Sequence, residues 1–226
     1  MKKTMILILA GALLLAAAGC VNGGNRIQTF GNSDKGLYLY RDISLEDVLI
    51  ADFDTSKYDL NEYRGFLDEE IAAYNDTHDF VPVLPSARDE SAVAMTAPVT
   101  VTKCMVTGGK LRQQLLYANA GDFVEYNTEE ILKSERKGAK LNAGTLEHVD
   151  GAVLAAKILK PDGEELEVNK ICLSNDAGKY RFIVTDMDVV LYGDGQIVGY
   201  SSGARYDKEN NCVIVPGGSV EAVIFK

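Results

Sequence analysis

Residues 59–76 read DLNEYRGFLDEEIAAYND, and the spacing of their capping and apolar residues predicts a helix. Asp59 and Glu62 stand at the spacing of side chains that accept hydrogen bonds from the free amides of a first helical turn. Apolar side chains recur every three or four residues, which places them on one helical face: Tyr63, Leu67, Ile71 and Tyr74. The other face is acidic, so the helix should lie on the surface of a core, with Gly65 as its weak point.

The sequence on the C-terminal side of this helix has a strand pattern. Residues 97–106, APVTVTKCMV, and residues 110–118, KLRQQLLYA, are rich in β-branched and apolar side chains. They flank Gly108 and Gly109, a pair that suits the positive backbone φ angles of a tight turn. The pattern therefore predicts an antiparallel hairpin.

Two more helix starts are predicted from the spacing of capping side chains. Ser44 is followed three positions later by Asp47, as in a helical first turn. Residues 121–137, GDFVEYNTEEILKSERK, form a second helical patch, in which Asn127 and Glu130 repeat that spacing. We expect this second helix to be short and interrupted near Asn127.

Residues 151–226 predict strands only, separated by turn signals roughly every 8 to 12 residues. The strand-like runs are AVLAAKILK, EELEVNKI, YRFIVT, DVVLY, QIVGY, NCVIV and SVEAVIF, and the turns contain Pro161-Asp162-Gly163, Asp194-Gly195 and Pro216-Gly217-Gly218. Such spacing is typical of a small antiparallel sandwich or partial barrel. The predicted fold class is α+β, with an N-terminal helix packed on antiparallel strands and an all-β C-terminal half.

The first twenty residues have the order of an export signal: Met-Lys-Lys, an apolar run over residues 5–19, and then Cys20. Residues 13–20, LLLAAAGC, resemble the lipobox of bacterial lipoproteins, with Ala17 at the position where leucine is commonest. The resemblance implies that a diacylglyceryl group and further acyl chains such as palmitate are attached to Cys20, and that the chain is cleaved before it. An ordinary secretory signal with a chance cysteine is the alternative.

The predicted organisation has four parts: a lipoprotein signal peptide over residues 1–19, a lipidated flexible tether over 20–36, an α+β region over 37–150, and a β-rich region over 151–226. The tether is assigned from its four glycines and its lack of apolar periodicity. The last two regions are either separate domains or one domain. The apolar run of the signal is shorter than the roughly 20 residues that a membrane-spanning helix needs, so a retained transmembrane helix is the weaker interpretation.

A second resemblance concerns the mature part of the chain. Residues 52–75, DFDTSKYDLNEYRGFLDEEIAAYN, and residues 122–127, DFVEYN, together with the lipobox, are similar to a group of uncharacterised lipoproteins of Gram-positive anaerobes. That group has no known activity to carry over. The resemblance implies only a location, the extracytoplasmic face of the cell membrane in a Gram-positive envelope.

The charge balance limits the classes of partner. The chain has 33 acidic and 23 basic residues and a net charge of −10 at pH 7, and cleavage would also remove Lys2 and Lys3. Such a surface repels nucleic acid and anionic head groups. The expected partners are therefore the membrane, through lipid on Cys20, and an envelope protein or extracellular ligand. No nucleic acid and no cofactor is expected.

Three cysteines are left once Cys20 is assigned to lipid: Cys104, Cys172 and Cys212. An odd number cannot be fully paired, so a disulfide framework is not expected. Each lies in an apolar, strand-like stretch, where a free cysteine behaves as a small hydrophobic residue. We expect buried thiols, with a single disulfide as the alternative.

Two sequence matches suggest nucleophilic catalysis, and neither is complete. Residues 199–203, GYSSG, fit the G-x-S-x-G pattern of a nucleophile elbow, but the elbow must join a strand to a helix, and no histidine follows Ser201. A bend between strands explains these residues better. Ser134 and Lys137 have the S-x-x-K spacing, yet the Ser-Asp-Asn and Lys-Thr-Gly motifs that accompany it are missing from the sequence.

Metal ligands are sparse in the sequence. The possible ligands are two histidines and two acidic pairs: His78, His148, Asp52 with Asp54, and Asp186 with Asp188. A calcium loop starting at Asp52 would need glycine and glutamate where Lys57 and Tyr63 stand. Asp186 and Asp188 are weak candidates for holding a cation at a strand end, and the histidines are expected on the surface.

These observations favour a tethered, non-catalytic protein that binds or scaffolds a partner at the cell envelope, with no catalytic residue assigned. The alternative is an envelope hydrolase or metal-dependent enzyme whose site is assembled from residues far apart in the sequence. For that alternative, two carboxylates and a histidine would have to converge near Ser201, the candidates being His148, Asp186 and Asp188.

Overall fold

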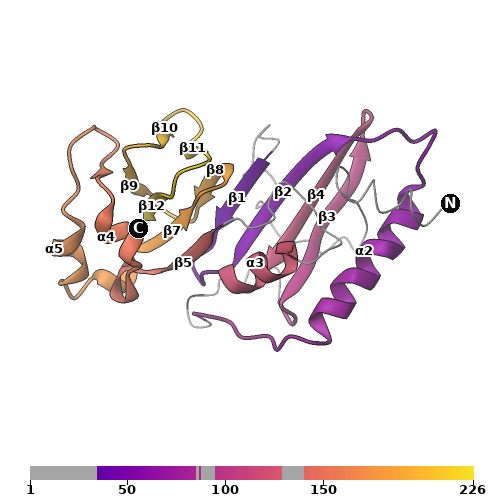
Figure 1. Cartoon of the computed structure of the whole chain (residues 1–226), viewed down its shortest axis with the longest axis horizontal. Coiled ribbons are helices and arrows are strands. Elements are labelled where there is room, and N and C mark those ends of the chain that lie inside the picture. The colour runs from indigo at the N-terminus through magenta and orange to yellow at the C-terminus, as the bar shows by residue number, and fades with distance from the viewer. Residues whose placement is uncertain (1–34, 85–86, 88–94, 129–139) are drawn as a thin grey trace.

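The computed structural model describes residues 35–84, 87, 95–128 and 140–226 (Figure 1). The signal peptide, Cys20 and most of the tether lie outside the described residues, as do Glu130, Ser134 and Lys137. The first strand begins at Lys35, so the last two residues assigned to the tether belong to the folded part.

Twelve strands and four α-helices are formed by the described residues. The strands are β1 (Lys35–Leu39), β2 (Leu45–Asp52), β3 (Val99–Thr107), β4 (Lys110–Tyr117), β5 (Leu141–Thr145), β6 (Ile158–Leu159), β7 (Arg181–Thr185), β8 (Asp188–Gly193), β9 (Ile197–Ser201), β10 (Arg205–Asp207), β11 (Cys212–Pro216) and β12 (Glu221–Phe225). The helices are α2 (Leu60–Asn75), α3 (Ala120–Thr128), α4 (Gly151–Ala155) and α5 (Val168–Cys172), with 3₁₀ turns η4 (Leu146–His148) and η5 (Ala177–Lys179).

The strands form two sheets, which confirms the α+β fold class. One sheet has seven strands in the order β10-β11-β8-β1-β2-β4-β3, and the other has five in the order β5-β7-β12-β9-β6. Neighbouring strands are antiparallel except for β1 and β8, which are parallel. Through that pair, strands from both sequence regions share the larger sheet, and β5 of the first region joins the smaller sheet.

The predicted helix over residues 59–76 is confirmed as α2, and its apolar face is buried. Asp59 caps it by accepting hydrogen bonds from the amides of Asn61 and Glu62. Buried side chains of α2 and α3 share one core with both sheets: Leu67, Ile71, Tyr74, Phe123, Tyr126, Leu45, Tyr117, Leu191, Val213, Ile183, Val223 and Phe225. Burial of such side chains contributes about 1.5–3 kcal/mol each.

A second core lies on the other face of the five-stranded sheet. There α4, α5 and η4 pack on β7 and β12 through Leu146, Val153, Ile158, Val168, Phe182, Val184, Ala222 and Ile224. These short helices lie at the end of the molecule opposite α2 (Figure 1). The five-stranded sheet is thus covered on both faces.

The strand-only interpretation of residues 151–226 is wrong in two places. The run AVLAAKILK contains most of α4 and only a two-residue strand, and EELEVNKI contains most of α5. The links at Asp194-Gly195 and Pro216-Gly217-Gly218 are also not hairpins, because β8 and β11 belong to the seven-stranded sheet while β9 and β12 belong to the other. Most links in this half carry the chain from one sheet to the other.

Nearer the N-terminus, the hairpin is confirmed and two helix starts are wrong. Gly108 and Gly109 have φ angles of 60° and 73° between β3 and β4, the left-handed region that favours glycine. Ser44 precedes strand β2, not a helix, and its amide donates to Asp42. Asn127 lies within α3, where its side chain donates to the Phe123 carbonyl 2.7 Å away.

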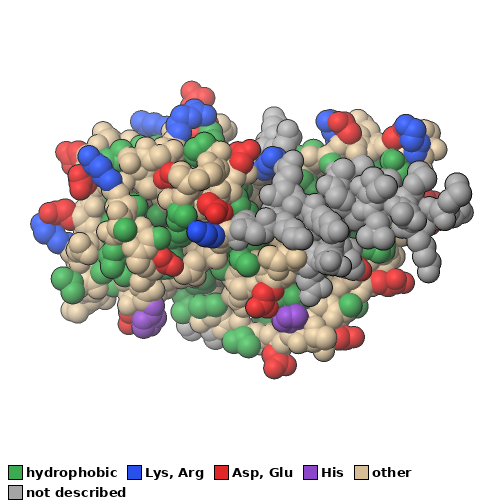
Figure 2. Space-filling view, viewed as in Figure 1, with side chains coloured by type: hydrophobic (Ala, Val, Ile, Leu, Met, Phe, Trp, Pro, Cys, Tyr) green, Lys and Arg blue, Asp and Glu red, His purple; other side chains and the backbone are tan. Residues whose placement is uncertain are grey.

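The surface mixes charges of both signs. Figure 2 shows acidic and basic side chains scattered over the described part of one face, with apolar side chains between them. Exposed large apolar side chains among the described residues include Val81, Val83, Met105, Leu154, Leu173 and Val220. No helix in the described ranges combines the length and the apolar composition needed to cross a membrane.

Candidate functional site

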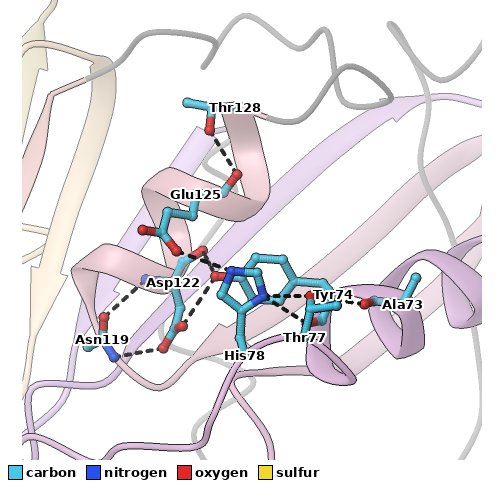
Figure 3. Close-up of polar contacts among 8 residues, drawn as sticks. All are labelled: Ala73, Tyr74, Thr77, His78, Asn119, Asp122, Glu125 and Thr128. Atoms are coloured by element: carbon cyan, nitrogen blue, oxygen red, sulfur yellow. Dashed lines mark hydrogen bonds and ion pairs between the residues drawn. The ribbon is translucent and has the colours of Figure 1, made fainter.

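The end of α2 and the first turns of α3 bring ionisable and aromatic side chains together (Figure 3). The Tyr74 hydroxyl lies 3.2 Å from Oδ1 of Asp122. The His78 ring stacks on the Tyr74 ring with centroids 3.9 Å apart, and its Nε2 lies 3.3 Å from a Glu125 carboxylate oxygen. Residues almost fifty positions apart in the sequence therefore meet at one junction between two helices.

Local capping places Asp122 at this junction. The Asp122 amide donates to Oδ1 of Asn119 at 3.0 Å, and Nδ2 of Asn119 donates to Oδ2 of Asp122 at 2.7 Å. Asn119 thus stands at the start of α3 as a capping residue. Tyr74 reaches the same carboxylate because it lies on the buried face in the last turns of α2.

Burial governs the electrostatics of Asp122. Desolvation raises the pKa of its carboxyl group above the ordinary value, and the nearby charge of Glu125 adds to the increase. The hydrogen bond from Tyr74 and the charge of His78 act in the opposite direction. The fold therefore favours the protonated form of Asp122 more than water does.

The geometry around His78 is that of a junction between helices. Its Nδ1 lies 2.9 Å from the Tyr74 carbonyl oxygen and 3.0 Å from the Thr77 hydroxyl, while Glu125 lies at Nε2. A histidine beside a carboxylate is able to transfer protons. Here Nδ1 contacts the end of α2, Nε2 contacts Glu125 of α3, and 31% of the His78 side chain is exposed.

Ser201 of the GYSSG motif is closed off from a substrate. It is 3% exposed, donates to Oε2 of Glu221, and accepts from the Ala222 amide at 2.9 Å. The Ser219 hydroxyl donates to the other oxygen of Glu221 at 2.7 Å. Strand β9 leads through a turn into β10 and not into a helix, so the elbow geometry is missing at Ser201, as the sequence indicated. The Ser201 and Glu221 pair holds β9 against β12.

The weak metal candidates Asp186 and Asp188 point to different partners across the link from β7 to β8. Asp186 accepts from the Lys140 amide at 2.7 Å, whereas Asp188 lies 3.6 Å from Nζ of Lys35. Within the part of the chain that the structure describes, no group of three or more His, Cys, Asp or Glu side chains is arranged to hold a metal ion. A cation at these two carboxylates stays a prediction.

The remaining ligand candidates lie apart from one another. Asp52 pairs with Lys110 at 2.8 Å, and Asp54 pairs with Lys57 at 2.6 Å, which helps to lower the pKa of Asp54 to about 2. His148 is exposed in η4. These carboxylates stabilise a turn and a strand end, and Ser201, Asp186 and Asp188 each bond to a different partner.

The three cysteines in the described residues are free thiols. Cys104 and Cys212 are buried in strands, as expected, whereas Cys172 is half-buried and lies in α5. Burial raises the pKa of all three thiols. Little thiolate is present at neutral pH, so these cysteines are poor nucleophiles.

Sequence reasoning missed a buried polar group on the seven-stranded sheet. Glu46 of β2 is 4% exposed and accepts from the hydroxyls of Tyr40 and Thr102, with Nε2 of Gln114 3.5 Å away. Glu46 was missed because the sequence predicted a helix start at Ser44, where the structure has strand β2. Successive side chains of a strand point to opposite faces of the sheet, so a strand assignment would have placed Glu46 and Leu45 on different faces.

No protein-family model, no curated protein and no solved structure matches this chain. The resemblance to lipoproteins therefore rests on residues 13–20, 52–75 and 122–127.

Proposed function

We propose that this protein is a lipoprotein held at the extracytoplasmic face of the cell membrane by lipid on Cys20, where its folded part binds a ligand or scaffolds a partner without catalysis. The observation that carries the proposal is the sequence LLLAAAGC at residues 13–20, behind a basic start and an apolar run. The resemblance of residues 52–75 to Gram-positive lipoproteins supports the same location.

Lipid chemistry makes such an anchor effective. Each methylene group buried in the bilayer contributes about 0.8 kcal/mol, and two or three acyl chains give stable attachment where one would be marginal. A tether that ends before Lys35, where β1 begins, would hold the folded part roughly 20 Å from the anchor. A binding surface on the folded part would then work close to the membrane.

Binding is favoured over catalysis by how the candidate catalytic groups are used. Ser201 is buried against Glu221, and the thiols have raised pKa values. His78 and Asp122 join two helices. Ser201, His78 and Asp122 thus already have roles in holding the fold together, and the thiols are poor nucleophiles.

Substitution of Cys20 tests the anchor. We expect the full-length protein to fractionate with membranes, and the Cys20→Ser variant to lose acylation by mass spectrometry of its N-terminus. Cys172→Ser is the matched control, because it removes a half-buried thiol of the folded part and should leave the protein in the membrane. An unacylated wild-type N-terminus, or a mature chain that starts elsewhere than residue 20, would overturn the proposal.

A further inference from the structure

The His78 ring lies between α2 and α3, and each of its nitrogens faces an oxygen atom (Figure 3). The ring stacks on Tyr74 of α2, and Nδ1 lies 2.9 Å from the Tyr74 carbonyl oxygen and 3.0 Å from the Thr77 hydroxyl oxygen. On the other side, Nε2 lies 3.3 Å from a carboxylate oxygen of Glu125 on α3. The imidazole is therefore the direct contact between the end of one helix and the other.

The Tyr74 carbonyl determines which nitrogen holds the proton of the neutral ring. A carbonyl oxygen only accepts hydrogen bonds, so the 2.9 Å contact requires a proton on Nδ1. With the proton on Nε2 instead, Nδ1 would accept from the Thr77 hydroxyl but would turn its lone pair toward the carbonyl oxygen. The geometry therefore favours the Nδ1–H tautomer of the neutral ring.

In that tautomer the contact with α3 is repulsive. The Nε2 lone pair and an oxygen of the ionised Glu125 carboxylate are both acceptors, and they face each other at 3.3 Å. A second proton on the ring, at Nε2, turns the same contact into a charge-assisted hydrogen bond. Histidine is the side chain that ordinarily changes its charge between pH 5 and 8. The sign of the contact between His78 and α3 therefore depends on pH.

The other charged groups around His78 are acidic. Burial raises the pKa of Asp122 on α3, the charge of Glu125 adds to the increase, and the charge of His78 opposes it. Asp76 and Asp79 flank His78 in the sequence. Within the described ranges, no lysine or arginine forms an ion pair with Glu125 or Asp122. Loss of the proton from His78 thus leaves two like charges three residues apart on α3, which is unfavourable.

We propose that protonation of His78 closes a tie between α2 and α3 through Glu125, and that loss of this proton opens the tie. The stacked Tyr74 ring and the bond to its carbonyl hold the imidazole in the same place in both states, so the proton changes only the contact with α3. The tie itself does not depend on the lipid anchor. Its use as a sensor of the pH outside the cell rests on the proposed location.

The tie is a partly exposed contact, which sets the size of its effect. The His78 side chain is 31% exposed and the Glu125 side chain is 64% exposed. Ion pairs of this kind change an unfolding equilibrium by roughly two- to fivefold. A purely structural contact would contribute equally at every pH, whereas the tie contributes only when the ring has two protons.

A double-mutant cycle at two pH values tests the tie. The four proteins are the full-length wild type, His78→Gln, Glu125→Gln and the double variant, with EDTA present so that no metal ion replaces the proton. Urea unfolding gives the unfolding equilibrium constant of each, and the cycle isolates the coupling between the two side chains. We expect a favourable coupling of about two- to fivefold at pH 5.5, and none or an unfavourable one at pH 8. Asp122 is present in all four proteins, so its own titration cancels.

Nitrogen-15 NMR of the imidazole ring measures the protonation directly. We expect the wild-type His78 ring as the Nδ1–H tautomer at pH 8, and with a proton on each nitrogen at pH 5.5. The Nε2–H tautomer at pH 8 would overturn the proposal, because a neutral ring would then donate to Glu125. A favourable coupling of equal size at both pH values, or no coupling at either, would also overturn it.

His148→Gln is the matched control, because His148 is the other histidine of the chain and is exposed in η4. This substitution removes a titrating imidazole away from the junction of α2 and α3. The coupling between His78 and Glu125 should be the same in its presence at both pH values. The cycle measures folding and not membrane attachment, so failure of the tie and failure of the lipid anchor are told apart.

Discussion

Gly65 is exposed in the interior of α2, and a Cβ atom added there would meet nothing within 4 Å. Glycine costs a helix interior about 0.8–1.0 kcal/mol relative to alanine, through the freedom it has in the unfolded chain. We predict that Gly65→Ala raises the free energy of unfolding by about 0.5–1 kcal/mol, measured by urea denaturation.

Gly199 is the matched control for that substitution. A Cβ atom there would lie 2.6 Å from a methyl carbon of Ile158 and 2.7 Å from one of Leu166. Overpacking of this kind costs about 1–3 kcal/mol, so Gly199→Ala should lower the free energy of unfolding. A loss of stability in Gly65→Ala would contradict the assignment of Gly65 to an open helical surface.

Asp122 gives the fold a dependence on pH. Burial raises the pKa of Asp122 in the folded state. Its contribution to the stability of the fold is therefore fully present below the ordinary value of 3.8 and is lost as pH rises through the raised value. Asp122→Asn keeps an acceptor for Asn119 and removes the buried charge. We predict that it increases stability near pH 7, on the order of 1 kcal/mol, and has little effect at pH 3 in urea unfolding.

Asp54→Asn should change the pH dependence with the opposite sign. The Lys57 and Ser56 side chains lower the pKa of Asp54 to about 2. Its contribution to the stability of the fold is therefore present above 3.8 and is lost as pH falls. The substitution should therefore reduce stability at neutral pH and have less effect in acid. If the Asp122→Asn variant showed the same pH dependence, burial would not control the pKa of Asp122.

Ile43 shows what the sequence does not reveal at this scale. A β-branched residue with a positive φ angle costs about 1–3 kcal/mol, and full burial of its side chain contributes about 1.5–3 kcal/mol. The two effects are similar, so the core can hold the turn in a strained shape. Ser44 and Asp47 have the spacing of a helix cap, but tertiary packing places Ser44 before strand β2 and Asp47 within it.

At the scale of elements, Asn75 joins the end of α2 to the edge strand β3. Its side-chain amide donates to the Val99 carbonyl at 2.9 Å, and its Oδ1 accepts from the Val99 amide at 3.0 Å. These two bonds satisfy backbone groups on the edge of the seven-stranded sheet. We predict that Asn75→Ala lowers the free energy of unfolding by about 1–3 kcal/mol in urea denaturation.

Asn75→Asp distinguishes the contributions of these two hydrogen bonds to stability. The carboxylate still accepts from the Val99 amide but cannot donate to the Val99 carbonyl. Hydrogen–deuterium exchange of the Val99 amide should stay slow in this variant and become faster in Asn75→Ala. Equal exchange in the two variants would contradict the role assigned to Asn75.

Elements fixed by local signals were predicted correctly, and pairings fixed by distant contacts were not. The cap at Asp59 and the glycines of the β3–β4 turn act over a few residues, so α2 and the hairpin followed from the sequence. The run AVLAAKILK was ambiguous, because a short apolar run fits a buried helix as well as a strand. The partners of β8, β9 and β12 depend on how two sheets pack, which no local pattern encodes.

The same limit applies to the candidate sites. The GYSSG match could be discounted from the sequence, since the strand and turn that follow it were readable. Tyr74 and Asp122 lie almost fifty positions apart in the sequence, and only the packing of α2 and α3 brings their side chains together. Such contacts could not be predicted from local sequence patterns.

At the scale of the whole molecule, the pairing of β1 with β8 and of β5 with β7 crosses the boundary drawn at residue 150. Without residues 151–226, β1 and β5 would lose partner strands and the core would lose its second sheet. We predict that the folded part unfolds in one transition, with coincident curves by circular dichroism and by tyrosine fluorescence. A fragment of residues 37–150 should stay unfolded in its amide NMR spectrum, while residues 35–226 fold. Two separate transitions, or a folded 37–150 fragment, would show two domains.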